Sequence, residues 1–209
     1  MTLSTGIRAV DRTFGGGIPA GSLVVLTSPP EAQVGPLLNA GVHVRPTLYF
    51  TTIRTESAVE NELDRLTDDP QLKTLQHVGV DGALLDILAG MQTLGEREDV
   101  IVDVLDPLEE AADQSEYVTF LNDFADRLQA TDSIGILHCM ETEENPTNRK
   151  LTLAAADFVW ELHCQHESSK LSYELRIPKA SGLQISDDDR VMDLNLGRSV
   201  SIDTSRDIA

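Results

Sequence analysis

Residues 15–28 read GGGIPAGSLVVLTS, a glycine-rich turn that leads straight into an apolar segment. The segment from residue 23 to residue 28 shows no polar alternation, which is typical of a strand buried on both faces of a parallel sheet. Before the turn, residues 4–14 read STGIRAVDRTF and place three apolar side chains on one side of a short helix that the glycines end. The stretch therefore predicts a helix, a tight turn and a core strand.

Apolar strands and amphipathic helices alternate through the next hundred residues. Strands are predicted at 47–52, 72–78, 99–105 and 134–140, and helical segments at 34–42, 56–66, 82–94 and 117–128. Such alternation predicts an α/β fold whose parallel sheet is covered by helices on both faces.

The pattern changes after Asn145. A short helix is predicted at 151–156, followed by two strands, 158–164 and 171–177, around the polar turn 165–170. The last two strands are predicted at 191–196 and 199–202. Antiparallel strands should therefore close the sheet.

The composition suits one globular domain. The chain has 209 residues, of which 41% are hydrophobic, enough for one sizeable core, and this excludes a disordered acidic tail or a fibrous protein. It contains no linker, repeat or low-complexity tract that would divide it. We expect a single domain over residues 1–209.

The charge is strongly negative and unusual in its make-up. The chain carries 35 Asp and Glu against 16 Lys and Arg, a formal net charge of −19, and only four of the basic residues are Lys. An Asp-rich, Lys-poor surface is typical of proteins from extreme halophiles, where molar salt screens the self-repulsion. The alternative is an acidic surface that selects a basic partner.

The cysteine positions, the first ten residues and the length of the apolar runs indicate the cellular location. Neither cysteine lies in a CxxC motif, the first ten residues lack the features of a signal peptide, and no apolar run approaches 18 residues. We expect a cytoplasmic protein with no membrane contact.

Several strings resemble the RecA superfamily, and more closely its KaiC-like and archaeal RadA-like branch. They are STGIRAVD at 4–11, GGGIPAG at 15–21 with the strand behind it, ADFVWEL at 156–162 and RIPK at 176–179. The resemblance spans roughly residues 4–203. It implies a RecA-like core with a mainly parallel central sheet flanked by helices and closed by antiparallel C-terminal strands.

The same resemblance shows what the phosphate-binding loop lacks. The branch holds nucleotide with a GxxxxGK[ST] loop, in which backbone N–H groups cradle the phosphates, the lysine reaches them and the hydroxyl holds Mg²⁺. Here Val34 stands at the lysine position, Gly35 at the hydroxyl position, and Glu31 adds a negative charge. The degenerate loop consists of Ser28, Pro29, Pro30, Glu31, Ala32, Gln33, Val34 and Gly35.

Other functional positions of the branch are only partly retained. The Walker B aspartate corresponds to Asp103, but residues 51–54, TTIR, lack the water-activating glutamate after the second strand. Of a Lys-x-Arg pair that reaches a neighbour's nucleotide in KaiC-like rings, Lys179 remains and Ser181 replaces the arginine. We therefore expect a pseudo-ATPase with no catalytic residues, no cofactor and no metal.

Other roles for these residues stay open from the sequence. In the alternative to a pseudo-ATPase, Asp103 holds Mg²⁺, Lys179 or Arg54 supplies the missing cation, and the protein is a divergent ATP-binding protein or ATPase of the KaiC/RadA type. Otherwise Asp103 is a strand-end carboxylate bonded to the loop beside it. We also expect Glu31 or Ser28 to accept hydrogen bonds from the start of the helix after the loop.

Metal ligands are present in two places. Asp106, Glu109 and Glu110 predict the acidic first turn of a helix, with a metal cluster as the alternative. A zinc site would need Cys164 and His166 to meet Cys139 across the sheet.

The expected function is regulatory. A retained fold with a dismantled phosphate site predicts a scaffold or regulatory protein that acts through a protein partner, either an active RecA/KaiC-like relative or a second copy. Nucleic-acid binding is not expected, because the chain has no basic stripe and no interleaved aromatic and basic residues.

Overall fold

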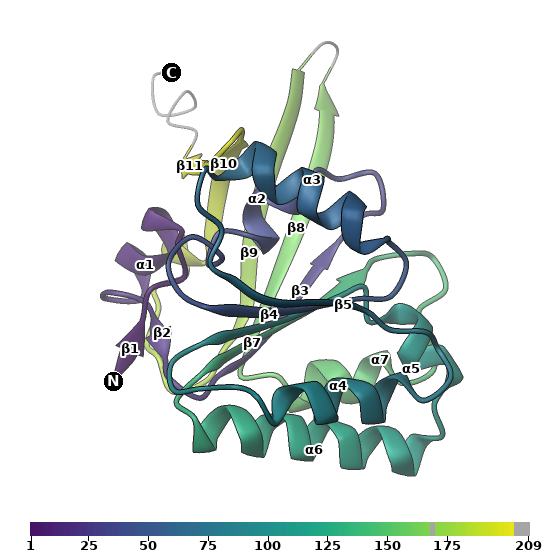
Figure 1. Cartoon of the computed structure of the whole chain (residues 1–209). Coiled ribbons are helices and arrows are strands. Elements are labelled where there is room, and N and C mark those ends of the chain that lie inside the picture. Colours follow the sequence, from purple (N-terminus) through teal and green to yellow (C-terminus); the bar gives the residue numbers. More distant parts are fainter. Residues whose placement is uncertain (168–169, 203–209) are drawn as a thin grey trace, which may run out of the picture.

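The computed structural model describes residues 1–167 and 170–202. Its centre is a nine-stranded sheet with the order β11-β10-β9-β8-β3-β7-β6-β4-β5 (Figure 1). The strands are β3 (Leu23–Ser28), β4 (Thr47–Thr51), β5 (Leu72–His77), β6 (Asp99–Asp103), β7 (Ile134–Met140), β8 (Phe158–Glu167), β9 (Lys170–Ala180), β10 (Val191–Leu196) and β11 (Val200–Ile202). The pairings from β5 to β8 are parallel and those from β8 to β11 antiparallel, which confirms the predicted fold class.

Strand β3 occupies the middle of the sheet. It pairs in parallel with β7 on one side and with β8 on the other, and all six of its residues are buried. A strand with partners on both edges and helices on both faces has no place for a polar side chain except at its ends. This explains why LVVL runs without alternation and why hydroxyl groups appear only at Thr27 and Ser28.

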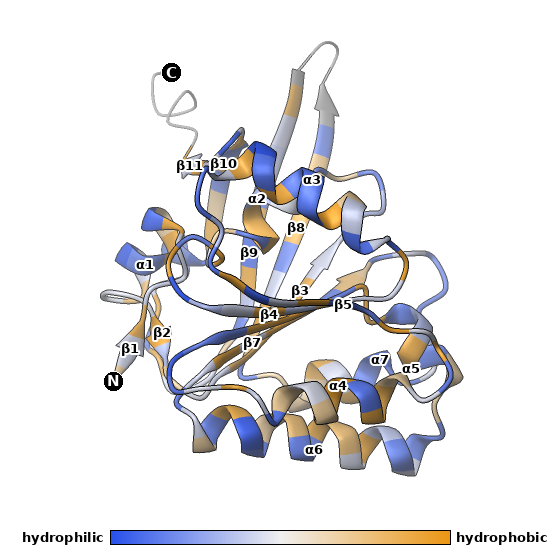
Figure 2. Ribbon diagram, viewed as in Figure 1, coloured by the Kyte–Doolittle hydropathy of each residue, from blue (hydrophilic) through white to orange (hydrophobic). Residues whose placement is uncertain are grey.

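Helices cover both faces of the sheet, as predicted (Figure 1). One face carries α1 (Arg8–Thr13), α2 (Gly35–Leu38) and α3 (Glu56–Leu66), and the other carries α4 (Ala83–Met91), α5 (Asp106–Ala111), α6 (Gln114–Ala130) and α7 (Arg149–Ala155). Hydrophilic and hydrophobic bands alternate along α3 and α6, as in amphipathic helices that pack on a sheet (Figure 2). Two buried clusters result: Val24 and Leu26 of β3 belong to one, Leu23 and Val25 to the other.

The glycine-rich turn packs against the N-terminus. Strand β1 (Thr2–Leu3) pairs with β2 (Ile18–Pro19) in a small separate sheet. Gly17 has φ +127°, and a Cβ there would lie 2.0 Å from the carbonyl oxygen of Leu3. Only glycine fits this approach, because other residues rarely adopt that backbone conformation and the contacted atom is backbone.

The segment after the phosphate loop forms less helix than expected. A helical segment was predicted over 34–42, but α2 contains four residues and turns follow it. A Cβ at Gly41 would lie 2.5 Å from Oδ2 of Asp99, so the chain here passes close to the buried Arg45–Asp99 ion pair. This close approach takes the place of a continued helix.

The first two closing strands, β8 and β9, are longer than predicted. Strands β8 and β9 form a hairpin that extends beyond the rest of the sheet (Figure 1). Part of the predicted turn at 165–170 lies outside the described residues. A short 3₁₀ helix, η1 (Asp188–Arg190), leads into β10. Among the helices described, none combines the length and the apolar character that a membrane span requires.

Candidate functional site

Polar side chains from four adjacent strands meet near the carboxyl ends of those strands, beside the degenerate phosphate loop. Ser28 ends β3, His138 lies near the end of β7, Asp103 ends β6 and Tyr49 lies on β4. The register places these strands side by side, and strand alternation puts the four side chains on the same face as the cluster that contains Leu26, Tyr49, Ile101 and Ile136. In open α/β sheets, ligands bind beyond this edge.

These side chains form one continuous hydrogen-bonded network. His138 bonds through Nε2 to Oγ of Ser28 at 2.9 Å and through Nδ1 to Oδ1 of Asp103 at 2.7 Å. The hydroxyl of Tyr49 donates to Oδ2 of Asp103 at 2.9 Å, and Nη1 of Arg54 lies 3.8 Å from the same oxygen. Both oxygens of the Asp103 carboxylate therefore have protein partners.

The network keeps Asp103 ionised although it is buried. Burial alone would raise its pKa, but the hydrogen bond and charge of His138, the Tyr49 hydroxyl and the charge of Arg54 together hold that pKa below its ordinary value. Burial and the neighbouring Asp103 raise the pKa of Tyr49 well above its ordinary value, so the phenol stays protonated and keeps donating. An ionised Asp103 accepts from Nδ1–H of His138, and Nε2 of the same ring bonds to the Ser28 hydroxyl.

The Ser28–His138–Asp103 order matches the atoms of a serine-hydrolase triad. Here, however, Ser28 is only 1% exposed and Asp103 only 3%. A nucleophile has to reach its substrate, and this hydroxyl is enclosed by protein. In this structure the Ser28 hydroxyl is bonded within the network and is not open to solvent.

Arg54 links the network to helix α3. Its Nη2 forms an ion pair with Glu62 and donates to the carbonyl of Ala58 at 3.1 Å. Burial would lower the pKa of Arg54, but the Glu62 carboxylate raises it above its ordinary value, so the guanidinium is always charged. A cation is therefore present beside Asp103, and a second carboxylate already binds it.

Glu62 also occupies space at the phosphate loop. A Cβ placed on Gly35 would lie 1.7 Å from Oε1 of Glu62, so this carboxylate lies directly against Gly35. Gly35 is the position where the family resemblance expects the Mg²⁺-holding hydroxyl. A carboxylate from α3 lies there instead.

The loop itself differs from the expected capping arrangement. Glu31 is exposed, and Ser28 bonds to His138, so neither accepts from the start of α2. The N–H groups of Leu37 and Leu38 donate to the carbonyl of Val34, within the turn. The expectation that Glu31 or Ser28 would take these donors is wrong, because α2 has no side-chain cap and its first turn closes on the carbonyl of Val34.

Lys179 lies on the other face of the sheet from Asp103. Its Nζ donates to the carbonyls of Leu153 and Ala154, at 3.2 and 2.9 Å, and so closes the C-terminal end of α7. Lys179 pairs across the hairpin with Val159, a member of the cluster under α4 to α7. Lys179 is therefore not brought to the phosphate loop, whereas Arg54 is.

The sequence places the chain in a family. The sequence profile of DUF7125, described as a family of unknown function, matches residues 2–209. This chain belongs to the DUF7125 family. Its fold is similar to that of a KaiC-like protein from the hyperthermophilic archaeon Pyrococcus horikoshii OT3, with a TM-score of 0.78 and 14% identity over 97% of this chain and 98% of that one. No curated protein matches the sequence.

The likeness shows that this DUF7125 chain has a KaiC-like RecA fold. At 14% identity, the likeness supports a statement about the fold and none about function.

A second buried network lies on the opposite face, beneath α5 and α7. Arg149 donates from Nη2 to Asp106 and from Nε to Glu109, both at 2.8 Å, and from Nη1 to the carbonyl of Met140 at 2.9 Å. Thr152 donates to the other oxygen of Glu109. The predicted acidic first turn of α5 is confirmed for Asp106 and Glu109, and Arg149 forms an ion pair with each of them.

The metal alternatives do not fit this geometry. Asp106, Glu109 and Cys139 lie close enough to share an ion, but the guanidinium of Arg149 already binds both carboxylates. Cys139 packs in the cluster beneath α5 to α7, and Cys164 packs against the cluster on the other face. The zinc alternative is therefore wrong for this pair, and the side chain of His166 lies outside the described residues.

Proposed function

We propose that this protein is a non-catalytic RecA/KaiC-like domain that acts as a regulatory or scaffold protein by binding another protein. One observation carries the proposal. At the nucleotide edge, the end of the sheet beside the degenerate phosphate loop 28–35, the charged side chains bind one another. Asp103 is bonded to His138 and Tyr49, and Arg54 joins Asp103 to Glu62.

The side chains at this edge do not fit a magnesium nucleotide. The metal would need a free Asp103 oxygen and a hydroxyl at residue 35, and the phosphates would need a cation near Val34. Binding would have to separate Asp103 from its buried partners and expel the Glu62 carboxylate from Gly35. The carboxylates of Asp103 and Glu62 would also face the phosphates, and repulsion between these like charges opposes binding further.

The retained fold supports action through protein contacts. RecA-like subunits associate by heterologous contacts, so a subunit without a working site can sit beside an active relative or beside its own copy. The hydrogen bonds and ion pairs around Asp103 hold this edge in one arrangement without a ligand. A partner that binds there would therefore meet a preorganised surface.

A second candidate function rests on Arg54. Its guanidinium lies 3.8 Å from Asp103, so a cation is present where the loop lacks its lysine. If Glu62 turned away, Arg54 would face an incoming phosphate, and the protein would be a divergent ATP-binding protein.

Calorimetry with ATP and Mg²⁺ in 1 M KCl, with a parallel phosphate-release assay, separates these two functions. We expect neither binding nor turnover in the wild type, because the groups that stabilise transferred phosphate are missing or already bonded. Micromolar binding that Asp103→Ala and Arg54→Gln abolish, and that the exposed control Asp123→Ala retains, would establish the ATP-binding function instead.

The partner is tested by sedimentation of the pure chain and by crosslinking capture from a high-salt lysate of the source cells. We expect either a defined oligomer or capture of a RecA-fold relative. A strictly monomeric chain that captures no such relative contradicts the proposal, whatever the nucleotide result.

A further inference from the structure

Helix α4 is apolar on nearly every side, although one side of it faces solvent. Asp86 is its one charged residue, in the sequence ALLDILAGM. The outer side carries Leu85, Leu88 and Ala89, at the i, i+3 and i+4 spacing of a stripe along a helix. Leu85 is 67% exposed, more than any other large apolar side chain among the described residues except Met1. A helix that is apolar all round is normally buried, so this stripe indicates a surface that another molecule covers.

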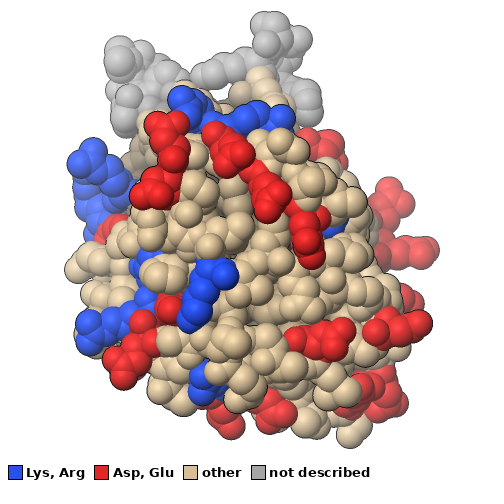
Figure 3. Space-filling view, in the orientation of Figure 1, with Lys and Arg blue, Asp and Glu red and all other residues tan. Residues whose placement is uncertain are grey.

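Carboxylates lie on both sides of the stripe. Helix α6 runs beside α4 (Figure 1), and a hollow of about 300 Å³ between them is lined by Leu88 and by Asp126 of α6. A second hollow, of about 170 Å³ at the start of α4, is lined by Glu116. Asp86 lies on the other side of the stripe, because residues two positions apart, such as Asp86 and Leu88, point to nearly opposite sides of a helix. Figure 3 shows carboxylates around the lower part of this face, where the two helices run. We call this surface the α4–α6 groove, formed by Leu85, Leu88 and Ala89 with Asp86, Glu116 and Asp126.

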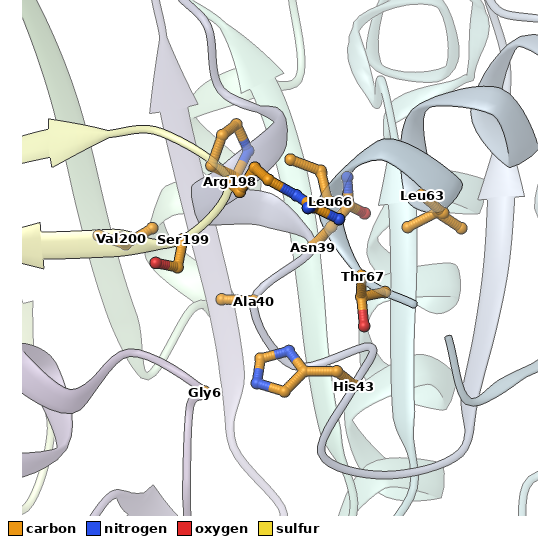
Figure 4. Close-up of a pocket in the computed structure, with 11 residues that line it drawn as sticks. Gly6, Asn39, Ala40, His43, Leu63, Leu66, Thr67, Arg198, Ser199 and Val200 are labelled. Atoms are coloured by element: carbon orange, nitrogen blue, oxygen red, sulfur yellow. The ribbon is translucent and has the colours of Figure 1, made fainter. Parts of the chain in front are cut away.

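The groove is preformed, and its carboxylates are available to a partner. Arg127 of α6 donates to three backbone carbonyls at and just beyond the end of α4, at 2.8–3.2 Å, and so holds the two helices together. No residue in the described part of the chain forms an ion pair with Glu116 or Asp126. The hollow between α2, α3 and the β10–β11 turn (Figure 4) differs, because its exposed cation, Arg198, is already paired with Asp68.

We propose that the α4–α6 groove binds an amphipathic helix of a partner protein, with basic residues along both flanks of its apolar stripe. The proposal gives a surface and a class of partner to the binding role proposed above, and rests on it. Apolar side chains of the partner pack on Leu85 and Leu88, and its basic side chains pair with Glu116 and Asp126 on one flank and with Asp86 on the other. A second copy that docked by the same face would bring these carboxylates against their own copies, and this repulsion disfavours it.

An NMR titration of the full chain in 1 M KCl tests the groove with a synthetic helical peptide. The peptide has about 18 residues, a leucine stripe at i, i+3, i+4 and i+7 spacing, and lysines along both flanks. We expect shifts centred on residues 83–91 and 116–127 and a dissociation constant of about 100 μM or tighter. A peptide with glutamate in place of each lysine should bind at least about tenfold more weakly, because like charges then face each other. A peptide of the same composition in scrambled order should cause no localised shifts.

An apolar substitution locates the stripe. Leu85→Ser should weaken binding of the lysine peptide about tenfold, because it removes the most exposed apolar side chain of the groove. Val191→Ser, at an exposed position on β10, is the matched control and should leave binding unchanged. Both positions are exposed, so both variants should fold.

Charge substitutions locate the acidic flank. Glu116→Gln combined with Asp126→Asn should weaken the lysine peptide about fivefold. Glu60→Gln combined with Asp64→Asn removes two exposed carboxylates from α3, on the other face of the sheet, and should leave the affinity unchanged.

Three results of the titration would overturn the proposal. They are the absence of localised shifts with the lysine peptide, equal binding of the lysine and glutamate peptides, and binding that Leu85→Ser leaves unchanged. Self-association of the pure chain that Leu85→Ser abolishes would assign the groove to a second copy and would also overturn it.

The crosslinking capture, repeated with Leu85→Ser, separates this proposal from the proposed function. Capture of a RecA-fold relative by the wild type that Leu85→Ser loses would support both. Equal capture by the two chains would overturn the groove and leave the proposed function standing. A monomeric wild type that captures no relative contradicts the proposed function, even where the peptide binds.

Discussion

Two buried carboxylates, those of Asp103 and Asp99, make stability depend on pH in opposite directions. The folded-state pKa of Asp103 is held below its ordinary value of 3.8, so its contribution to stability is present above that pH and is lost as the pH falls through the lowered pKa. Asp99 lies on the same strand four residues earlier and behaves in the other sense. Its burial raises its pKa to about 6, although Nε of Arg45 lies 2.7 Å away and lowers it.

Titration of Asp99 should therefore lower the free energy of unfolding as the pH rises from 4 to 7. Its raised pKa favours the protonated folded form, so the contribution is complete below pH 4 and lost as the pH passes 6, about 3 kcal/mol in all. Asp99→Asn removes this titration. The difference in unfolding free energy between the variant and the wild type, measured by urea titration, should thus shift in favour of the variant by about 2–3 kcal/mol from pH 4 to pH 7.

The exposed residue Asp123 supplies the control, and Asp123→Asn should follow the wild-type pH profile. A constant difference between wild type and Asp99→Asn across this range would show that the Arg45 charge, rather than burial, dominates at Asp99.

At the scale of elements, local patterns predicted the strands and helices well. Runs such as LVVL and VIV are apolar because each strand is covered on both faces, and that signal lies within a few residues. The length of α2 could not be read this way, because the Arg45–Asp99 pair that passes Gly41 joins residues 54 positions apart.

The candidate site was predicted only in part for the same reason. Asp103 and the loop were found from a resemblance of local strings. The partners His138, Tyr49 and Glu62 come from other strands and from α3, and only the sheet register brings them together. A histidine on an apolar strand, as in ILHCM, was the one available signal, and a single such residue does not reveal its partner.

Helix α7 depends on Arg149 for its attachment to β7 and α5. Replacing Arg149 with Met leaves Asp106 and Glu109 buried without a counter-charge, which should lower the unfolding free energy by about 3–5 kcal/mol at pH 7.5. Burial already raises the pKa of Glu109, and losing Arg149 raises it further, so the loss should be smaller at pH 5.

Denaturant unfolding of Arg149→Met beside Lys150→Met checks this attachment. Lys150 is the exposed neighbour on the same helix, and its replacement should cost less than about 0.5 kcal/mol. Equal effects of the two substitutions would contradict the role given to Arg149.

For the whole molecule, the surface charge is the dominant feature. Carboxylates are spread over α3 and around the lower edge of the face in Figure 3, and few basic side chains lie between them. Self-repulsion at −19 should weaken the fold at low salt, since the Debye length falls from about 10 Å at 0.1 M to about 3 Å at 1 M.

We therefore expect the melting temperature to rise between 0.1 and 1 M KCl. A gain of ~2 kcal/mol from screening corresponds to about 4–8 °C for a chain of this size, measured by circular dichroism. Sucrose, which does not screen charge, serves as the control. A melting temperature indifferent to KCl would favour the alternative in which the acidic surface selects a basic partner.

The central position of β3 also has a consequence for synthesis. This strand leaves the ribosome well before its two partners, which begin at Ile134 and Phe158, more than a hundred residues later. At about 5–20 residues per second, β3 stays unpaired for roughly 5–20 s while β4, β5 and β6 are already available to one another. We expect the sheet to assemble from its β5 edge inward, so that β3, the first strand of the central sheet to be made, is among the last to be enclosed.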